Sequence, residues 1–358
     1  MKRIFCLILA LSLCLVTLLT SCTGNSGPVV MEYEGVRLTE DIYRYWVACY
    51  KAQFAYQLNE ENEEEIAALI DENIKKSLVS AGLFNRYGLQ LSDTAREQIN
   101  RGISLLVEDI GNGDRAAFNE AIAEYGIDYD GLKIAFTYEQ MALALRGYLF
   151  GENGHYSISR EQYENYYKET YAHVYMIYVC TVDFATDEDN LRIWDEESGS
   201  YLYEKKTGTA LAEALAKADE VRTALKTLRS EAEFQALAED LTEDPSSKKY
   251  TDGYYFSKEG DYSDYVSAVT DKVHSLKVGE TAEVESEIGY HFIYRAEPTA
   301  EAWDAGVNED FFEGFDARVR HRYFEMAVTT ELPLVAVYST VKDEIDFSAI
   351  PANWELYW

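Results

Sequence analysis

Basic residues are scarce in this chain of 358 residues. Lys and Arg total 32 against 64 Asp and Glu, which gives a net charge of -32 at pH 7. Such an excess of negative charge repels the phosphates of nucleic acids and the headgroups of anionic lipids. We therefore exclude nucleic acid as a partner. Any attachment to a membrane has to be covalent or apolar.

Cysteine and histidine are also few, at five residues each, and no pair has the spacing of a metal site. Internal repeats and low-complexity tracts are absent from the sequence as well. Hydrophobic residues make up 47% of the chain and charged residues 27%, which excludes a wholly disordered chain and a multi-span membrane protein. The length favours two or three domains.

An apolar run from Ile4 to Thr20 follows Lys2 and Arg3, and the sequence Leu-Thr-Ser-Cys ends at Cys22. This pattern resembles the bacterial lipoprotein signal, which implies a signal peptide over 1–21 and a lipid on the sulfur of Cys22. Residues 22–28 then form a flexible spacer. The expected location is extracytoplasmic, with the protein anchored to the cell membrane. An ordinary signal peptide and an uncleaved anchor helix are the alternatives.

The next part of the chain has helical periodicity. Residues 29–38 predict a strand or hairpin that turns at Gly35, and Thr39 precedes two acidic residues as a helix N-cap. Apolar residues then recur at helical spacing, interrupted by glycines. Two of the predicted helices begin at Thr39 and at Ser92. The others cover 60–86, 114–125 and 130–150.

Beyond residue 157 the pattern becomes mixed. Ser159 opens a capping box, and a helix follows to about Tyr171. Residues 174–179 are apolar, β-branched and aromatic, which is typical of a buried strand. Further helices are predicted at 210–228, 231–240 and 309–330, further strands at 254–256, 282–284 and 290–295, and a loop or hairpin excursion at 186–206. This order predicts an α+β fold.

Three segments resemble the parvulin-type (PpiC, rotamase) prolyl isomerases. FQALAEDLTEDP at 234–245 resembles a family helix with its following loop, and LKVGE at 276–280 resembles the turn before a strand. GYHFI at 289–293 resembles the last strand of the family. Their order and spacing carry the resemblance, because each segment alone is weak.

The surroundings resemble the extracytoplasmic foldases of the SurA and PrsA type. This resemblance implies a helical chaperone-like domain at 29–156, a linker helix at 157–170 and a parvulin-like domain at 171–297. The segment 298–358 is expected to pack on the N-terminal domain, so that the parvulin-like domain is inserted into a module made by both chain ends.

The resemblance also implies a site. His291 and Asp244 match the polar catalytic positions, and Met176, Tyr262 and Tyr265 are the candidates for the substrate pocket. Each has a structural alternative: a hydrogen-bonded core histidine, a turn cap, a core methionine, or tyrosines that simply pack.

Two positions depart from the family pattern. Asp252 stands where the family has the first of two glycines, and Gly253 matches the second. The first strand lacks the usual histidine: the preferred register places Met176 there, and His173 lies three residues earlier.

The implied activity is cis–trans isomerisation of X–Pro bonds in unfolded exported polypeptides, which needs no cofactor. Two alternatives stay open. The chain is then either a parvulin-fold holdase that has lost turnover or a surface lipoprotein of another binding class.

Overall fold

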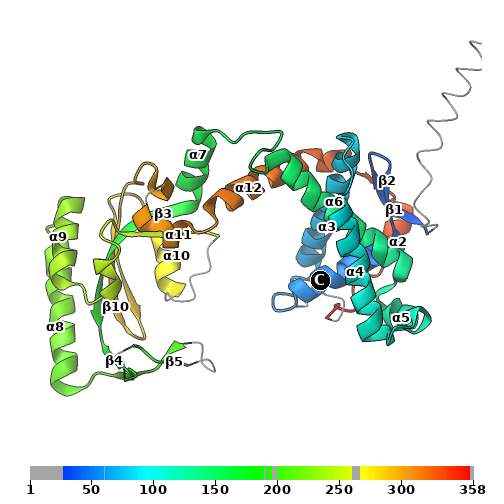
Figure 1. Cartoon of the computed structure of the whole chain (residues 1–358). Helices are drawn as coiled ribbons and strands as arrows, with labels where there is room; N and C mark the ends of the chain where they lie inside the picture. The colour runs from blue at the N-terminus through cyan, green and yellow to red at the C-terminus, as the bar shows by residue number, and fades with distance from the viewer. Residues whose placement is uncertain are drawn as a thin grey trace, which may run out of the picture. The chain divides into compact units, whose positions relative to one another are not determined.

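The computed structural model describes residues 27–59, 61–188, 191–195, 200–259, 267–304 and 306–354. Its described residues fall into two compact units (Figure 1). The first unit contains the residues up to Ser157 together with those from Arg320 onward. The second unit is Ile158–Val319, so it extends past residue 297, where the sequence placed the end of the parvulin-like domain.

The first unit is mainly helical. Thr39 is the N-cap of its first helix, and Ser92, Asp114 and Asp128 each accept a backbone N–H at the start of a later helix. The sequence predicted helix starts at Thr39, Ser92 and residue 114. The side chains of Ser92, Asp114 and Asp128 satisfy backbone donors that the first helical turn leaves free, whereas Thr39 makes no side-chain cap bond. The helices are α2 (Glu40–Gln53), α3 (Glu63–Arg86), α4 (Asp93–Gly111), α5 (Arg115–Ile122) and α6 (Tyr129–Phe150), with a short 3-10 turn, η1 (Ala123–Tyr125).

The two ends of the chain meet in a small sheet of the first unit. Strands β1 (Val29–Tyr33) and β2 (Val36–Thr39) form the expected hairpin, in which Gly35 takes a left-handed φ of 75°. Strand β11 (Ala336–Val337) pairs with β1 on its other side. The same unit holds η5 (Leu332–Leu334), α13 (Ser339–Lys342) and α12 (Phe315–Glu331) from Arg320 onward.

The second unit is built around a four-stranded antiparallel sheet of order β8-β3-β10-β9. Helix α7 (Arg160–Thr170) leads into it and begins with the capping box predicted at Ser159. The sheet consists of β3 (Tyr171–Cys180), β8 (Tyr254–Ser257), β9 (Thr281–Ser286) and β10 (Gly289–Arg295). The 108 residues 181–288 therefore separate the central strands β3 and β10 along the chain, and the pairing of these two strands fixes the register of the sheet.

Each face of the sheet has its own apolar core. Helices α8 (Gly208–Leu225) and α9 (Glu231–Leu241) cover one face, where Phe234 packs with Ile177 and Phe292. Helix α10 (Ser267–Ser275) lies on the other face, where Val269 and Val273 pack with the strand residues that point away from α8 and α9 (Figure 1). Because side chains alternate along a strand, odd-numbered residues of β3 face α8 and α9, and even-numbered residues face α10.

The remaining elements are short. A hairpin-like extension leaves the sheet through β4 (Val182–Phe184), β5 (Trp194–Asp195), β6 (Ser200–Tyr201) and β7 (Tyr203–Lys205), in agreement with the excursion predicted at 186–206. Turn η2 (Pro245–Lys248) follows α9, and η3 (Ala302–Asp304), η4 (Gly306–Asn308) and α11 (Glu309–Phe312) precede α12.

The sequence missed or merged three elements. Helix α10 was not predicted, because its only apolar anchors are two valines. The predicted helix at 309–330 is interrupted at Gly314, whose φ of 66° is a left-handed value that ends a helical turn. Strand β11 is only two residues long and has no period to read. The α+β fold class itself is confirmed.

Candidate functional site

The candidate site is a pocket at the edge of β3. Strand β8 pairs with β3 only over Tyr171–Val174, so from Tyr175 onward this edge of β3 has no partner strand. A pocket of about 440 Å³ lies there. Its lining comes from β3, α9, the loop after α9 and the start of β8, and includes Met176, Asp244 and Tyr254.

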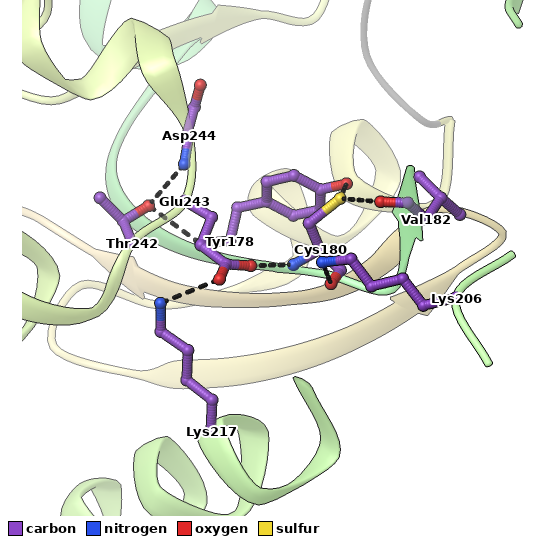
Figure 2. Close-up of polar contacts among 8 residues, drawn as sticks. All are labelled: Tyr178, Cys180, Val182, Lys206, Lys217, Thr242, Glu243 and Asp244. Carbon is purple, nitrogen blue, oxygen red and sulfur yellow. Dashed lines mark hydrogen bonds and ion pairs between the residues drawn. The ribbon is translucent and has the colours of Figure 1, made fainter. Parts of the chain in front are cut away.

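The loop after α9 is fixed to β3 by reciprocal hydrogen bonds (Figure 2). The backbone N–H of Tyr178 donates to Oγ1 of Thr242 at 3.1 Å, and the N–H of Glu243 donates to the carbonyl of Tyr178 at 2.8 Å. The carboxylate of Glu243 accepts the N–H of Cys180 at 2.6 Å and pairs with Lys217 at 3.1 Å. The residue that follows, Asp244, is therefore held at a defined position beside the strand.

The carboxylate of Asp244 has two partners of its own. Oδ1 accepts the backbone N–H of Ser246 at 2.9 Å, as the sequence alternative of a turn cap requires. Oδ2 accepts the hydroxyl of Tyr254 at 2.7 Å, and Tyr254 also lines the pocket. Asp244 therefore serves as a turn cap and also presents a fixed carboxylate to the pocket.

His291 lies on β10 and is buried, with 6% of its surface exposed. Its Nε2 is 2.9 Å from Oγ of Ser286, whose hydroxyl donates to the carbonyl of Gly289 at 3.2 Å. Its Nδ1 has no hydrogen-bond partner among the described residues. Burial lowers the pKa of His291 to about 4, although the nearby charge of Asp244 acts in the opposite direction. The imidazole is therefore neutral at pH 7.

Tyr178 occupies the strand position opposite His291. The two rings stack with centroids 4.9 Å apart, and the Tyr178 hydroxyl donates to the carbonyl of Ile288 at 2.8 Å. The sequence register placed Met176 at the first-strand histidine position of the family. In the structure Met176 pairs with Ile293, two residues along, and lines the pocket. The register of two strands that are 108 residues apart in the sequence cannot be predicted from a local pattern.

His173 faces the opposite side of the sheet from His291. Its Nδ1 lies 2.7 Å from the carbonyl oxygen of Glu297, and its Nε2 lies 2.6 Å from the carbonyl oxygen of Asp252. Its ring stacks on Tyr255 with centroids 4.5 Å apart. This histidine connects the segments before β8 and after β10 and is not part of the pocket.

Two glycines near the site are required by close approach. At Gly289 an added Cβ would lie 2.1 Å from the carbonyl oxygen of Val179 on the neighbouring strand. At Gly253 φ is 89°, and a Cβ would lie 2.6 Å from the carbonyl oxygen of Val174. These contacts explain why glycine begins the GYHFI motif and why glycine stands at position 253.

The structure thus brings Met176 and Asp244 into one pocket, while His291 is stacked on Tyr178 next to it. Sequence reasoning missed Tyr178, Tyr254 and Ser286, which no motif singled out. Tyr262, Tyr265 and Cys22 lie outside the described residues. Within the described part of the chain, no group of three or more His, Cys, Asp or Glu side chains is arranged to hold a metal ion. No helix of that part is both long and apolar enough to cross a bilayer.

Comparison with known families places a domain over the site. Residues 196–299 match the family model of the PPIC-type PPIase domain. This confirms the family resemblance for the segment that contains Asp244 and His291. The match begins after β3, so it does not include Met176 or Tyr178.

The chain is also similar to solved structures of PrsA proteins. Identity is 16% to PrsA from Bacillus subtilis, covering 90% of this chain and 94% of that one, with a TM-score of 0.23. Identity to the PrsA peptidylprolyl isomerase from Bacillus cereus is 14%, covering 93% of this chain and 96% of that one, with a TM-score of 0.27. Identity to the foldase protein PrsA from Streptococcus pneumoniae is 15%, covering 90% of this chain and 97% of that one, with a TM-score of 0.24. No curated protein matches the chain in sequence.

Proposed function

From the PPIC-type PPIase domain at 196–299, we propose that the protein is a membrane-tethered, extracytoplasmic peptidyl-prolyl cis–trans isomerase that assists the folding of exported proteins. The observation that carries the proposal is the pocket at the edge of β3. It combines an apolar side chain, Met176, with a carboxylate, Asp244, next to the buried neutral imidazole of His291.

The reaction needs no covalent step and no cofactor. Resonance in the amide gives rotation a barrier of about 18–20 kcal/mol, so an enzyme has only to bind the twisted amide better than either planar form. The pocket of about 440 Å³ has room for a prolyl ring with its flanking backbone. Met176 and the rings of Tyr175 and Tyr254 supply its apolar contacts.

Asp244 supplies the electrostatic part. Planar resonance places partial negative charge on the carbonyl oxygen of the substrate, and the twisted amide carries less of it. A carboxylate fixed near that oxygen therefore disfavours the planar forms more than the twisted one. The hydrogen bonds from Tyr254 and Ser246 keep the carboxylate in place before substrate binds, which avoids reorganisation during the reaction.

An isomerisation assay tests this directly. Protein comprising residues 23–358 is mixed with tetrapeptides that carry different residues before Pro, and the cis-to-trans relaxation is followed. We expect acceleration by the wild type and a loss of about 100-fold in kcat/KM for Asp244→Asn. Asp240→Asn, an exposed acid on α9, is the matched control. A folded wild type that accelerates no peptide would reject the proposed activity.

A holdase without turnover is the second candidate. The observation that favours it is that a tyrosine, Tyr178, and not a histidine stands opposite His291 on β3. It requires flat isomerisation together with suppressed aggregation of an unfolded client at stoichiometric ratio. The third candidate, a surface lipoprotein of another class, has less support, because a four-stranded sheet surrounds His291.

The tether rests on the lipoprotein-like sequence that ends at Cys22. A Cys22→Ser variant expressed from the full gene is expected to leave the membrane fraction and to lack the mass of a diacylglycerol. If Cys22→Ser and wild type fractionate alike, the anchor is not at this cysteine.

A further inference from the structure

The extension from the second unit has an exposed apolar face that the isomerase pocket does not use. We call its described residues, Val182–Glu188, Leu191–Asp195 and Ser200–Lys206, the arm. The described residues of the whole chain expose 17 large apolar side chains, and four of them lie between positions 191 and 202 of the arm. Figure 1 draws β4 and β5 beyond the end of the four-stranded sheet.

Ring contacts hold one side of the arm together. Trp194 contacts Tyr201 edge to face with centroids 5.0 Å apart, and Phe184 contacts both Tyr201 and Tyr203 at 6.3 and 6.1 Å. The guanidinium of Arg192 lies over Phe184, 3.9 Å from the ring centroid. This aromatic side gives the arm internal packing without a helix over it.

The opposite side is aliphatic and open. Trp194 pairs with Tyr201, so the neighbouring residues Ile193 and Leu202 also lie opposite one another, on the other face. Leu191 shares that face by alternation. Their exposed fractions are 64% for Leu191, 37% for Ile193 and 44% for Leu202. A partner that covers these three adjacent aliphatic side chains removes apolar surface from water, which favours binding.

Charge around this face selects the partner. Five of the arm's described residues are acidic and three are basic. Two of the basic side chains are already engaged, Arg192 by Phe184 and Lys206 by the carbonyl of Cys180 at 2.9 Å. Asp183, Glu188 and Glu204 are exposed. A second copy of a chain with net charge -32 is repelled by such a surface, whereas a basic segment is attracted.

We propose that the aliphatic face of the arm binds extended client segments that combine aliphatic and basic residues. The inference rests on the proposed foldase function and adds the class of client and the place where it binds. The arm would then hold a segment in the same unit as the isomerase pocket without itself taking part in bond rotation.

Peptide binding to the protein comprising residues 23–358 tests this. The probes are three labelled, proline-free 15-residue peptides, rich in Leu and Lys, in Leu and Glu, or in Ser and Lys, and the readout is fluorescence anisotropy. We expect the Leu/Lys peptide to bind wild type at least 10-fold more tightly than either other peptide. The triple variant Leu191→Ser, Ile193→Ser, Leu202→Ser should lose that advantage. The control, Leu215→Ser with Val278→Ser, removes two apolar side chains elsewhere in the same unit that are 38% and 43% exposed, and this variant should keep the advantage.

Each outcome decides between the proposals. If wild type and a folded triple variant bind the Leu/Lys peptide equally, the proposed client-binding role of the arm is rejected. It is also rejected if the wild type is a dimer and the triple variant is a monomer, because the face then binds a second copy of the chain. Tetrapeptide isomerisation by the same wild-type preparation is measured alongside. If the wild type does not accelerate isomerisation but the peptides bind as expected, the isomerase activity is rejected and the role of the arm is retained. If the wild type accelerates isomerisation but the triple variant binds the Leu/Lys peptide as tightly as wild type does, the isomerase activity is retained and the role of the arm is rejected.

Discussion

Two buried histidines on neighbouring strands of one sheet have opposite surroundings. His173 is 3% exposed and His291 is 6% exposed, so burial does not distinguish them. Both ring nitrogens of His173 lie against backbone carbonyl oxygens from two different segments. His291 has one nitrogen near a serine hydroxyl and the other without a partner among the described residues, beside a carboxylate.

We propose that this difference separates a structural role of His173 from a chemical role of His291. A histidine whose nitrogens are both engaged by main chain connects segments and has nothing left for a substrate. A histidine with an unused buried nitrogen costs stability, because a polar atom has lost water without replacement. Such a stability cost is expected at a residue whose surroundings are adapted to a reaction. Variants of the two histidines can therefore be compared directly.

The largest expected effect is on the pH dependence of stability. The pKa of His291 is lowered by burial from about 6.5 to about 4, so between these values the unfolded chain binds a proton that the folded chain does not. Stability from the neutral imidazole is complete above pH 6.5 and is lost as pH falls towards 4. The shift of about 2.5 units predicts a loss of about 3 kcal/mol by pH 4.

Urea denaturation at pH 7, 5.5 and 4 measures it, with His291→Gln as the reference. The variant has no titrating group at this position, so the wild type should lose about 3 kcal/mol more than the variant over this range. Parallel losses in the two proteins would show that His291 is not held neutral by the fold.

The second prediction compares the two histidines in activity. His291→Ala removes the polar group next to Asp244 and the pocket, and kcat/KM for tetrapeptides should fall about 100-fold, or about 2.7 kcal/mol. His173→Ala alters the other face of the sheet and should stay within about threefold per folded molecule. Equal losses in the two variants, with circular dichroism unchanged, would remove the distinction between them.

Local features of the fold were predictable from sequence, and cross-chain register was not. The capping box at Ser159 and the turn at Gly35 depend on neighbouring residues, so a short pattern suffices for them. The GYHFI motif located His291 on a strand for the same reason. Its neighbour Tyr178 lies 113 residues earlier, and only the pairing of β3 with β10 brings the two together.

The two pocket residues show the same limit. Asp244 was found because it follows an amphipathic helix inside a recognisable segment. Tyr254 completes its environment from the start of β8, and nothing in a chain with 29 tyrosines singles it out. Met176 was predicted as a pocket residue and lies in the pocket lining, whereas the residue opposite His291 is Tyr178, which no local pattern indicates.

The third prediction concerns stability at neutral pH. His173→Ala removes the hydrogen bond that the ring N–H donates to the carbonyl of Asp252 or Glu297, and it removes the stacking on Tyr255. The lost bond and the cavity together should lower the free energy of unfolding by about 2 kcal/mol. His291→Ala should cost less at pH 7, because its Nδ1 has no bond to lose. The two urea midpoints decide, and a smaller loss for His173→Ala would reverse the assignment.

The smallest expected effect separates positioning of Asp244 from packing in the pocket. Tyr254→Phe keeps the ring and removes the hydroxyl that donates to Asp244 at 2.7 Å. The carboxylate is then held by Ser246 alone, so kcat should fall about fivefold, equivalent to about 1 kcal/mol, while KM stays nearly constant. Tyr250→Phe is a close control, since Tyr250 also lines the pocket but its hydroxyl donates at 2.7 Å to Asp310. A change in KM alone, or equal effects in both variants, would mean that Tyr254 contributes only its ring; a fall in kcat confined to Tyr254→Phe would show that the orientation of the carboxylate limits the reaction.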